Sequence, residues 1–229
     1  MNKLIQINSI SKKYEEKNIK VLNKINFTFS AGKIYSLMGP SGSGKSTLLN
    51  LISLIDKPTS GKIKLNGVSV DFNNDSFTDE LRANNIGIIY QEKNLLSDFT
   101  ALENVVIARL AINSDEKKAV KESINLLKKV GLTKRLNHYP SELSGGEAQR
   151  VAISRALINS PKIILADEPT GSLDEKNSEE IFRLLCKLKN NNRTIIFATH
   201  NRYFANLADC KIQLLSGKLK VINDNRKKI

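Results

Sequence analysis

The sequence has little cysteine and no long apolar run, and these absences argue against several classes of protein. Its two cysteines, Cys186 and Cys210, are too few and too far apart for a disulfide framework or a zinc site. Cys186 lies in an apolar stretch, so we expect a buried thiol that fills core space. No run of about 18 apolar residues occurs, which argues against a membrane-spanning helix. The chain also has no internal repeat and no linker rich in glycine, proline or serine, so we expect a single domain over residues 1–229.

The charge is unusual, with a formal net value of +13. An excess of this size suits nucleic acid, an anionic membrane surface or a polyanionic ligand. The basic residues are spread along the chain, and the one dense group, Arg226 to Lys228, reads as a solvated tail that could also touch lipid headgroups. The first residues after Met1 turn polar too soon for a secretory signal. We therefore expect a cytoplasmic location and give the net charge little weight in choosing a function.

Two kinds of pattern follow along the chain. Short β-rich segments come first and predict an antiparallel region near the N-terminus: residues 4–10, 25–29 and 62–65. A strand over 33–38 leads into a glycine-rich turn, and an apolar helix over 47–55 ends before Pro58.

The second half of the chain alternates helices with strongly apolar strands. The pattern is helical across 79–134, apart from a short strand over 86–90, and Ala119 and Leu127 lie on its apolar face. Two near-continuous apolar strands, 162–166 and 194–198, flank a helix over about 178–189. Such strands are typical of a parallel sheet covered on both faces. The predicted fold class is α/β, with a parallel-sheet core, an N-terminal antiparallel β region and a helical insert at about 90–160.

A phosphate-binding loop is the clearest motif. The motif fits the pattern G-x-x-x-x-G-K-[ST]. It follows a predicted strand and begins a predicted helix, as phosphate binding requires. Its residues are Gly39, Pro40, Ser41, Gly42, Ser43, Gly44, Lys45, Ser46 and Thr47. Glycines let backbone N–H groups curl around phosphate oxygens, and the helix N-terminus adds its dipole. Lys45 is expected to reach the β- and γ-phosphates, and Ser46 to ligate Mg²⁺. The motif predicts binding of MgATP or a similar nucleotide.

Two acidic residues and a histidine extend this prediction. Asp167 ends an apolar strand and is expected beside the metal, and Glu168 can polarise the water that attacks the γ-phosphate. His200 follows the strand 194–198 by way of Thr199, and the carboxyl edge of a parallel sheet is where nucleotides bind. We therefore expect His200 to contact the γ-phosphate and help to place the water.

A further motif starts at Leu143 and continues through Ser144, Gly145, Gly146 and Glu147. By itself it reads as a helix N-terminus, in which Ser144 and Glu147 form a capping box. Together with the preceding motifs it resembles the signature sequence of ABC ATPases. The resemblance implies that the signature of one subunit closes over ATP held by another, so that two copies form a head-to-tail dimer around two ATP molecules.

The resemblance covers nearly the whole chain and assigns roles to further residues. Tyr14 matches the aromatic that stacks on adenine, and Gln91 matches the glutamine that contacts Mg²⁺ and faces the membrane partner. Asp174 lies in the D-loop, which crosses the dimer interface. His200 matches the switch histidine. The family implies two transmembrane permease subunits as partners, with this chain peripheral to the cytoplasmic side of the membrane and with no role in binding nucleic acid.

Within the family, the segment that starts at Gln91 and the signature region look like the lipoprotein-releasing ATPases, and the segment 166–174 resembles a wider group that includes macrolide exporters and a cell-division ATPase. Three positions depart from the common pattern: Ala148, Ser172 and Asn201, the last where Asp is usual. Pairing with a related ATPase instead of a second copy stays open, as does the substrate. A soluble ABC ATPase that acts on nucleic acid or ribosomes, and a P-loop kinase or GTPase, are the alternative functions.

Overall fold

The computed structural model describes residues 2–14 and 19–224, so the basic cluster Arg226 to Lys228 lies outside the described residues. The chain divides into two compact units, one formed by Met1–Arg82 with Lys189–Ile229 and the other by Ala83–Leu188. Each unit is described by itself below. Among the helices of residues 2–14 and 19–224, none has the length and apolarity needed to cross a membrane.

The first unit contains an antiparallel sheet near the N-terminus, as the sequence predicts. Its strands are β1 (Lys3–Tyr14), β2 (Ile19–Ser30), β4 (Ser60–Leu65) and β5 (Val68–Ser69). β1 pairs with β2 and with β4, and the register places Ile5 opposite both Phe29 and Leu65. All three side chains are buried, so the pairing puts one apolar face of the sheet into the core.

A second group of strands in the same unit carries the phosphate-binding loop. Its members are β3 (Ile34–Met38), β8 (Thr194–Ala198), β9 (Cys210–Leu215) and β10 (Lys218–Asp224). β3 pairs in parallel with β8 on one side and with β9 on the other, whereas β10 is antiparallel to β9. β8 is buried along its whole length, which is the burial that a near-continuous apolar strand predicts.

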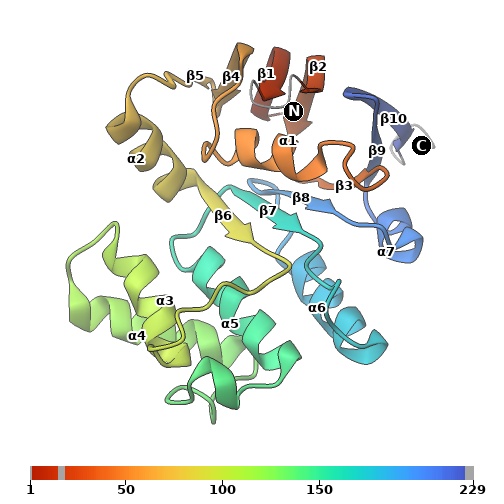
Figure 1. Ribbon diagram of the computed structural model, residues 1–229. Helices are drawn as coiled ribbons and strands as arrows, with labels where there is room; N and C mark the ends of the chain where they lie inside the picture. The colour runs from red at the N-terminus through yellow and green to blue at the C-terminus, as the bar shows by residue number, and fades with distance from the viewer. Residues whose placement is uncertain (1, 15–18, 225–229) are drawn as a thin grey trace. The chain divides into compact units, whose positions relative to one another are not determined.

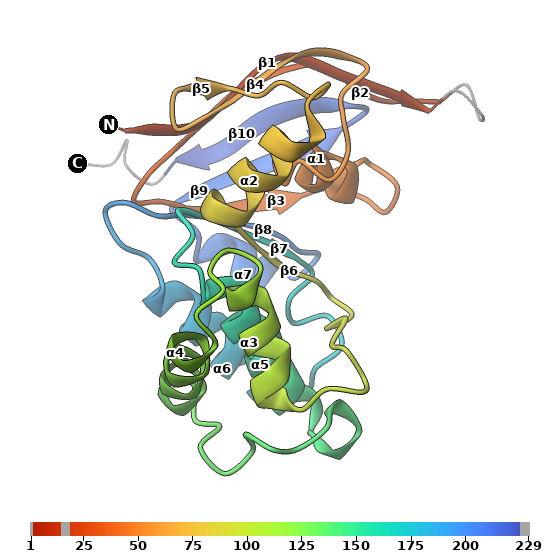
Figure 2. The ribbon, with the colours of Figure 1, turned by 90° about the vertical axis from the view of Figure 1, so that its left-hand side faces the viewer.

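Two helices of this unit frame the loops that follow β3 and β8. α1 (Lys45–Ile52) follows the phosphate-binding loop, and Figures 1 and 2 show it between the two groups of strands. It ends three residues earlier than the sequence pattern predicts, because Leu54 adopts a positive φ of 61° that no right-handed helix can contain. α7 (Arg202–Asn206) is short, and its N-cap is Asn201. A further helix, α2 (Asp75–Asn85), extends to the boundary between the units.

The second unit combines two strands with four helices and a short 3₁₀ helix. Its elements are β6 (Ile86–Ile89), α3 (Ala101–Leu110), α4 (Glu116–Lys129), the 3₁₀ helix η2 (Pro140–Glu142), α5 (Gly145–Leu157), β7 (Ile163–Asp167) and α6 (Glu175–Lys187). β6 and β7 are parallel. Both views in Figures 1 and 2 place α3, α4 and α5 side by side, and their apolar core includes Val105, Leu127 and Val151.

Two expectations for this unit need correction. The helical pattern across 79–134 is not one helical region, because β6 and the irregular segment 90–100 interrupt it. Asn104 explains part of this, since its buried amide donates to the carbonyl groups of Leu96, Phe99 and Thr100 at 2.9–3.1 Å and so fixes a turn there. Cys186 is half-buried, so it fills core space only in part, whereas Cys210 is buried. Within the residues that the structure describes, neither cysteine takes part in a disulfide.

Candidate nucleotide-binding site

The loop between β3 and α1 is shaped by glycines that leave no room for a side chain. A Cβ atom on Gly44, whose φ is +97°, would lie 2.7 Å from the Val21 side chain. A Cβ on Gly39 would lie 2.4 Å from the carbonyl oxygen of Leu214 in β9. The two ends of the loop are therefore packed closely against β9 and β2.

Lys45 lies over this loop and meets the histidine that the sequence singled out. Its Nζ donates to the carbonyl oxygens of Gly39 and Pro40 at 2.9 and 3.1 Å, and lies 3.4 Å from Nε2 of His200. Lys45 is only 7 % exposed. A buried ammonium and a histidine at the same loop suit the β- and γ-phosphates of a nucleotide. The structure thus brings Lys45 and His200 together, as the order of strands and loops predicts.

A buried hydroxyl in the loop is a second feature that fits a bound phosphate group. Within residues 2–14 and 19–224, the buried Oγ of Ser43 has no hydrogen-bond partner. A buried hydroxyl usually finds a partner, and a phosphate oxygen in the loop would supply one. The residues expected at the metal, Ser46, Gln91 and Asp167, carry side-chain oxygen atoms, which are the donors that Mg²⁺ takes in proteins.

In the second unit, β7 delivers Asp167 and Glu168 to the edge of the β6–β7 pair. β7 is buried up to Asp167, which is half-buried. Glu168 has a φ of +45°, a conformation that costs a non-glycine residue roughly 1–2 kcal/mol. The turn is closed by a hydrogen bond from the Gly171 amide to the Glu168 carbonyl at 3.0 Å. Strained residues of this kind persist where the surrounding structure holds them, which is common at functional sites.

Gln91 reaches the same edge from β6. Ile89 of β6 pairs with Ala166 of β7, so the residues after both strands meet at one edge. A Cβ atom on Gly171 would lie 3.1 Å from Nε2 of Gln91 and 3.4 Å from Cβ of Glu168. The side chain of Gln91 therefore packs against the turn that holds Glu168. The predicted grouping of Gln91 with the acidic pair is what this unit contains.

Side chains that the sequence reasoning missed hold the segment after Gln91 in place. Arg155, from the C-terminal part of α5, donates to the carbonyl oxygens of Lys93 and Asn94 at 2.9 and 2.7 Å. Burial lowers the pKa of the Arg155 guanidinium, which stays cationic at neutral pH. Nζ of Lys93 donates in turn to Oγ of Ser172 at 2.9 Å. No sequence pattern marks these contacts, because two of them end on backbone carbonyls, which every residue carries.

The signature segment forms the capping box that its residue types predict. Ser144 is the N-cap of α5, and its Oγ accepts from the amide of Glu147 at 3.2 Å, whose carboxylate accepts from the Ser144 amide at 2.9 Å. Arg135 donates to the same carboxylate at 2.7 Å. The hydrogen bond from Arg135, followed by the one from Ser144, lowers the pKa of Glu147 below its usual value of 4.5. The start of α5 is therefore capped by its own side chains.

The two signature glycines are in contact with the segment that follows β7. A Cβ on Gly146 would lie 2.5 Å from Oδ1 of Asn177, and a Cβ on Gly145 would lie 3.3 Å from the Leu173 side chain. Asp174 is the N-cap of α6 and accepts from the Asn177 amide at 3.0 Å. Hydrogen bonds from the backbone and side chain of Asn177 lower the pKa of Asp174. The D-loop and the signature therefore form one packed surface of the second unit.

Tyr14 is the last residue of β1, and its side chain contacts Asp56 and Lys12. Its hydroxyl donates to Oδ2 of Asp56 at 3.3 Å, and Nζ of Lys12 lies 4.9 Å from its ring centroid. The residue is 40 % exposed. Stacking of adenine on Tyr14 stays a prediction.

Comparison with known proteins decides between the alternative families. A family pattern described as ABC transporter matches residues 22–171. The chain belongs to the ABC transporter family. This match covers the phosphate-binding loop, the signature and the acidic pair, and it argues against a kinase or GTPase.

Relatives and solved structures agree with this assignment along almost the whole chain. The chain is 45 % identical to the lipoprotein-releasing system ATP-binding protein LolD of Rickettsia bellii, over 96 % of this chain and 99 % of the relative. It is 42 % identical to the uncharacterized ABC transporter ATP-binding protein YvrO of Bacillus subtilis, over 94 % and 95 %. A dimeric post-hydrolysis state of the ATP-binding cassette MJ0796, bound to ADP and Pi, has a TM-score of 0.87 at 36 % identity, over 96 % of this chain and 99 % of that chain.

These similarities establish the fold and the general activity. The chain has the fold of an ABC ATPase cassette, with an antiparallel N-terminal sheet, parallel strands and helices, as predicted. It is an ATP-binding subunit of an ABC transporter and an ATPase.

Proposed function

We propose that this chain binds MgATP and hydrolyses it. In the first unit, the backbone of residues 39–44 and the ammonium of Lys45 hold the phosphates, and His200 contacts the γ-phosphate. In the second unit, Asp167 serves the metal and Glu168 orients and deprotonates the attacking water. Mg²⁺ neutralises charge on the phosphates, with Ser46, Gln91 and Asp167 as its protein partners.

The observation that carries this proposal is the contact among Lys45, the start of its loop and His200. The ammonium is buried, lies within 2.9–3.4 Å of two carbonyl oxygens and the imidazole, and forms no ion pair with a carboxylate in the described residues. A buried cation without a counterion is costly unless a ligand supplies one. A polyphosphate is the ligand that the glycine-rich loop around it fits.

We propose further that two copies associate head to tail when ATP binds. The signature segment 143–147 of one copy would then cover the ATP bound by the other, and Tyr14 would stack on the adenine. Support comes from the packed surface that the signature shares with Asp174 and from the dimeric cassette structures to which this chain is similar.

The relatives support a proposal for the substrate of the transporter. The chain aligns over nearly its full length with ATP-binding proteins of lipoprotein-releasing systems. We therefore propose that it is peripheral to the cytoplasmic side of the cell membrane and energises two transmembrane permease subunits that release lipoproteins. An export role of the kind served by macrolide exporters is the second candidate function.

The experiment that tests this proposal uses the Glu168→Gln variant as a trap. The tagged variant is expressed in its host, held with MgATP, extracted gently from membranes and analysed by mass spectrometry. We expect two transmembrane permeases to co-purify in the presence of ATP and in smaller amounts with the Lys45→Ala variant, which serves as the matched control.

Two results would contradict the proposal in different places. Recovery of nucleic acid or ribosomal proteins in place of permeases would keep the ATPase chemistry and remove the transport role. Equal recovery of permeases with both variants would show that binding of ATP does not govern the assembly.

A further inference from the structure

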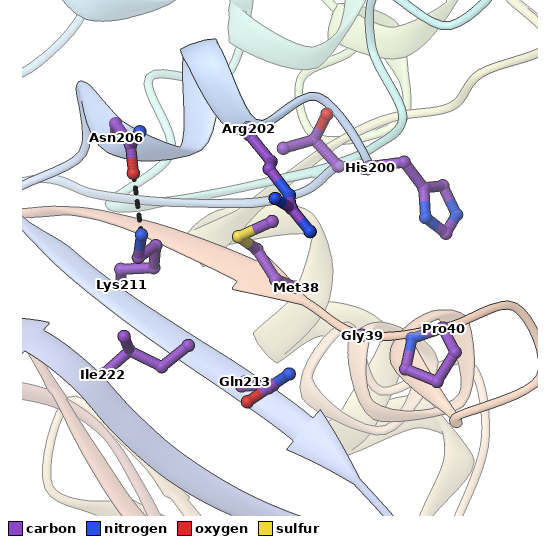
Figure 3. Close-up of a pocket in the computed structure, with 10 residues that line it drawn as sticks. Met38, Gly39, Pro40, His200, Arg202, Asn206, Lys211, Gln213 and Ile222 are labelled. Carbon is purple, nitrogen blue, oxygen red and sulfur yellow. Dashed lines mark hydrogen bonds between the residues drawn. The ribbon is translucent and has the colours of Figure 1, made fainter.

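A pocket of about 580 Å³ lies beside the phosphate-binding loop, within the first unit (Figure 3). Its walls come from the end of β3, the loop after β8, α7 and the hairpin of β9 and β10. The residues that matter for its chemistry are Pro40, His200, Arg202, Lys211, Gln213 and Ile222. Its volume falls within the roughly 300–1,000 Å³ typical of sites for small molecules.

The pocket is positively charged. His200, Arg202 and Lys211 are basic, and none of the residues that line the pocket is acidic. Arg202 extends from α7 towards the middle of the pocket (Figure 3). In the described ranges 2–14 and 19–224 it has no ion pair or hydrogen bond. Nζ of Lys211 donates to Oδ1 of Asn206 at 2.7 Å, a neutral partner that leaves its charge uncompensated. The lining therefore selects an anion.

Asn201 lies between His200 and Arg202 in the sequence, and its neutral side chain leaves their positive charge unopposed there. Its Oδ1 caps α7 by accepting from the amides of Tyr203 and Phe204 at 2.9 and 3.3 Å. An aspartate, which is usual at this position in the family, would make the same cap. It would also place a carboxylate next to the two basic residues. Asparagine keeps the cap and adds no negative charge between His200 and Arg202, which line the pocket.

We propose that this pocket binds inorganic phosphate. It shares Gly39, Pro40 and His200 with the phosphate-binding loop, so a phosphate ion that leaves the loop on the His200 side enters it directly. The planar guanidinium of Arg202 can hold two phosphate oxygens at once, and Lys211 and the amide of Gln213 can donate to others. The binding itself rests on these residues alone; a supply of phosphate from hydrolysis rests on the proposed function.

A direct titration tests the binding. The full-length Lys45→Ala protein, in which the phosphate-binding loop has lost its cation, is titrated with inorganic phosphate by isothermal calorimetry. Adding Arg202→Gln is expected to weaken phosphate binding by about tenfold or more, the effect of removing one hydrogen bond to a charged group. Adding Asn201→Asp is expected to weaken it as well while the helix cap is kept. Lys218→Gln, which removes one exposed positive charge from β10, is the matched control and is expected to bind as the parent does.

The outcomes separate cleanly. Absence of phosphate binding in the Lys45→Ala protein would overturn the proposal, and so would equal affinity in the Arg202→Gln, Asn201→Asp and Lys218→Gln proteins. Because Asn201→Asp retains the cap of α7, it keeps the test valid if Arg202→Gln disturbs that helix.

A single-turnover experiment distinguishes the two sources of the phosphate. With Lys45 intact, rapid quenching measures hydrolysis, and a fluorescent phosphate sensor measures release. A delay between hydrolysis and release that disappears in Arg202→Gln identifies the hydrolysis product as the occupant. Release that keeps pace with hydrolysis in both proteins, together with binding in the titration, identifies phosphate taken from solution. A protein that does not hydrolyse ATP would contradict the proposed function and leave the titration unaffected.

Discussion

The two units hold their functional residues in contrasting ways. In the first unit, the loop 39–44 is shaped by backbone geometry, since Gly39 and Gly44 meet the strands β9 and β2 at distances that exclude a Cβ atom. In the second unit, side chains position the site: Arg155 and Lys93 hold the segment after Gln91, and Ser144 caps α5. A loop whose shape depends on glycines can be recognised as a sequence motif. The contacts made by Arg155 and Lys93 follow no sequence pattern.

The largest change in activity should come from Glu168→Gln. This variant tests hydrolysis, which we assign to Glu168 in the second unit, separately from ATP binding by the loop of the first unit. The amide cannot accept the proton of the attacking water, so we expect hydrolysis to fall by roughly 10²–10⁴-fold. ATP affinity should stay near that of the native protein, because no phosphate contact is removed. Steady-state ATPase assays and nucleotide titrations measure the two quantities. Hydrolysis near the native rate would show that Glu168 is not the base.

Lys45→Ala should have the converse effect. Removing a buried charge that pairs with phosphate is expected to weaken ATP binding by about 2–5 kcal/mol, or roughly 30-fold and more. Lys62→Ala, at an exposed position on β4, is the control for a simple change in net charge. Native ATP affinity in Lys45→Ala, measured with a fluorescent nucleotide, would contradict the role of the loop.

A smaller effect is expected from Arg155→Ala, which tests the side-chain network of the second unit. Loss of two hydrogen bonds to carbonyl oxygens should loosen the segment after Gln91 and raise the Mg²⁺ concentration needed for tight ATP binding by several-fold. Arg155→Lys, which keeps the charge but lacks the planar fork, should restore the Mg²⁺ dependence only in part. The measurement is ATP affinity across a Mg²⁺ series. An unchanged Mg²⁺ requirement, with a lowered melting temperature, would assign Arg155 a structural role alone.

The smallest effect concerns the cap of α5 and its dependence on pH. Because hydrogen bonds from Arg135 and Ser144 lower the pKa of Glu147 in the folded chain, this carboxylate stabilises the fold above its unfolded value of about 4.5. That contribution disappears as the pH falls through the folded pKa. Arg135→Gln should therefore reduce stability at neutral pH by at most about 1 kcal/mol, since the pair is partly exposed. Thermal melts should show the native and variant proteins converging in acid, and a constant difference would contradict the linkage.

Much of the fold was predictable, for reasons that the elements themselves show. The antiparallel region and the apolar strands were predicted because β1 carries buried Leu4, Ile5, Ile7 and Ile10 and because β8 is apolar along most of its length. The hairpin of β9 and β10 was missed, although Cys210, Ile212 and Leu214 alternate with polar residues. Five of the seven residues of β10 are exposed, so that strand carries no apolar pattern to mark it.

The site divides along the same line. Although their roles stay predictions, the positions of Lys45, Glu168 and His200 were predicted from motifs that follow strands, and that of Gln91 from the family resemblance. Arg155 and Lys93 were not, because a contact from a side chain to a distant backbone carbonyl depends on how the helices pack. The roles of Tyr14 and Asp174 stay predictions, since both concern groups that a single copy of the chain does not contain.

The hairpin that the sequence did not reveal has a consequence for how far the nucleotide-binding part of this chain extends. Leu214 of β9 abuts Gly39, and the carbonyl of Gly217, in the hairpin turn, accepts from the Asn23 amide of β2 at 2.8 Å. A chain cut after His200 would keep every nucleotide motif and lose one wall of the loop that those motifs describe. The minimal ATP-binding fragment is therefore defined by the last strands of the fold, well beyond the last recognisable motif.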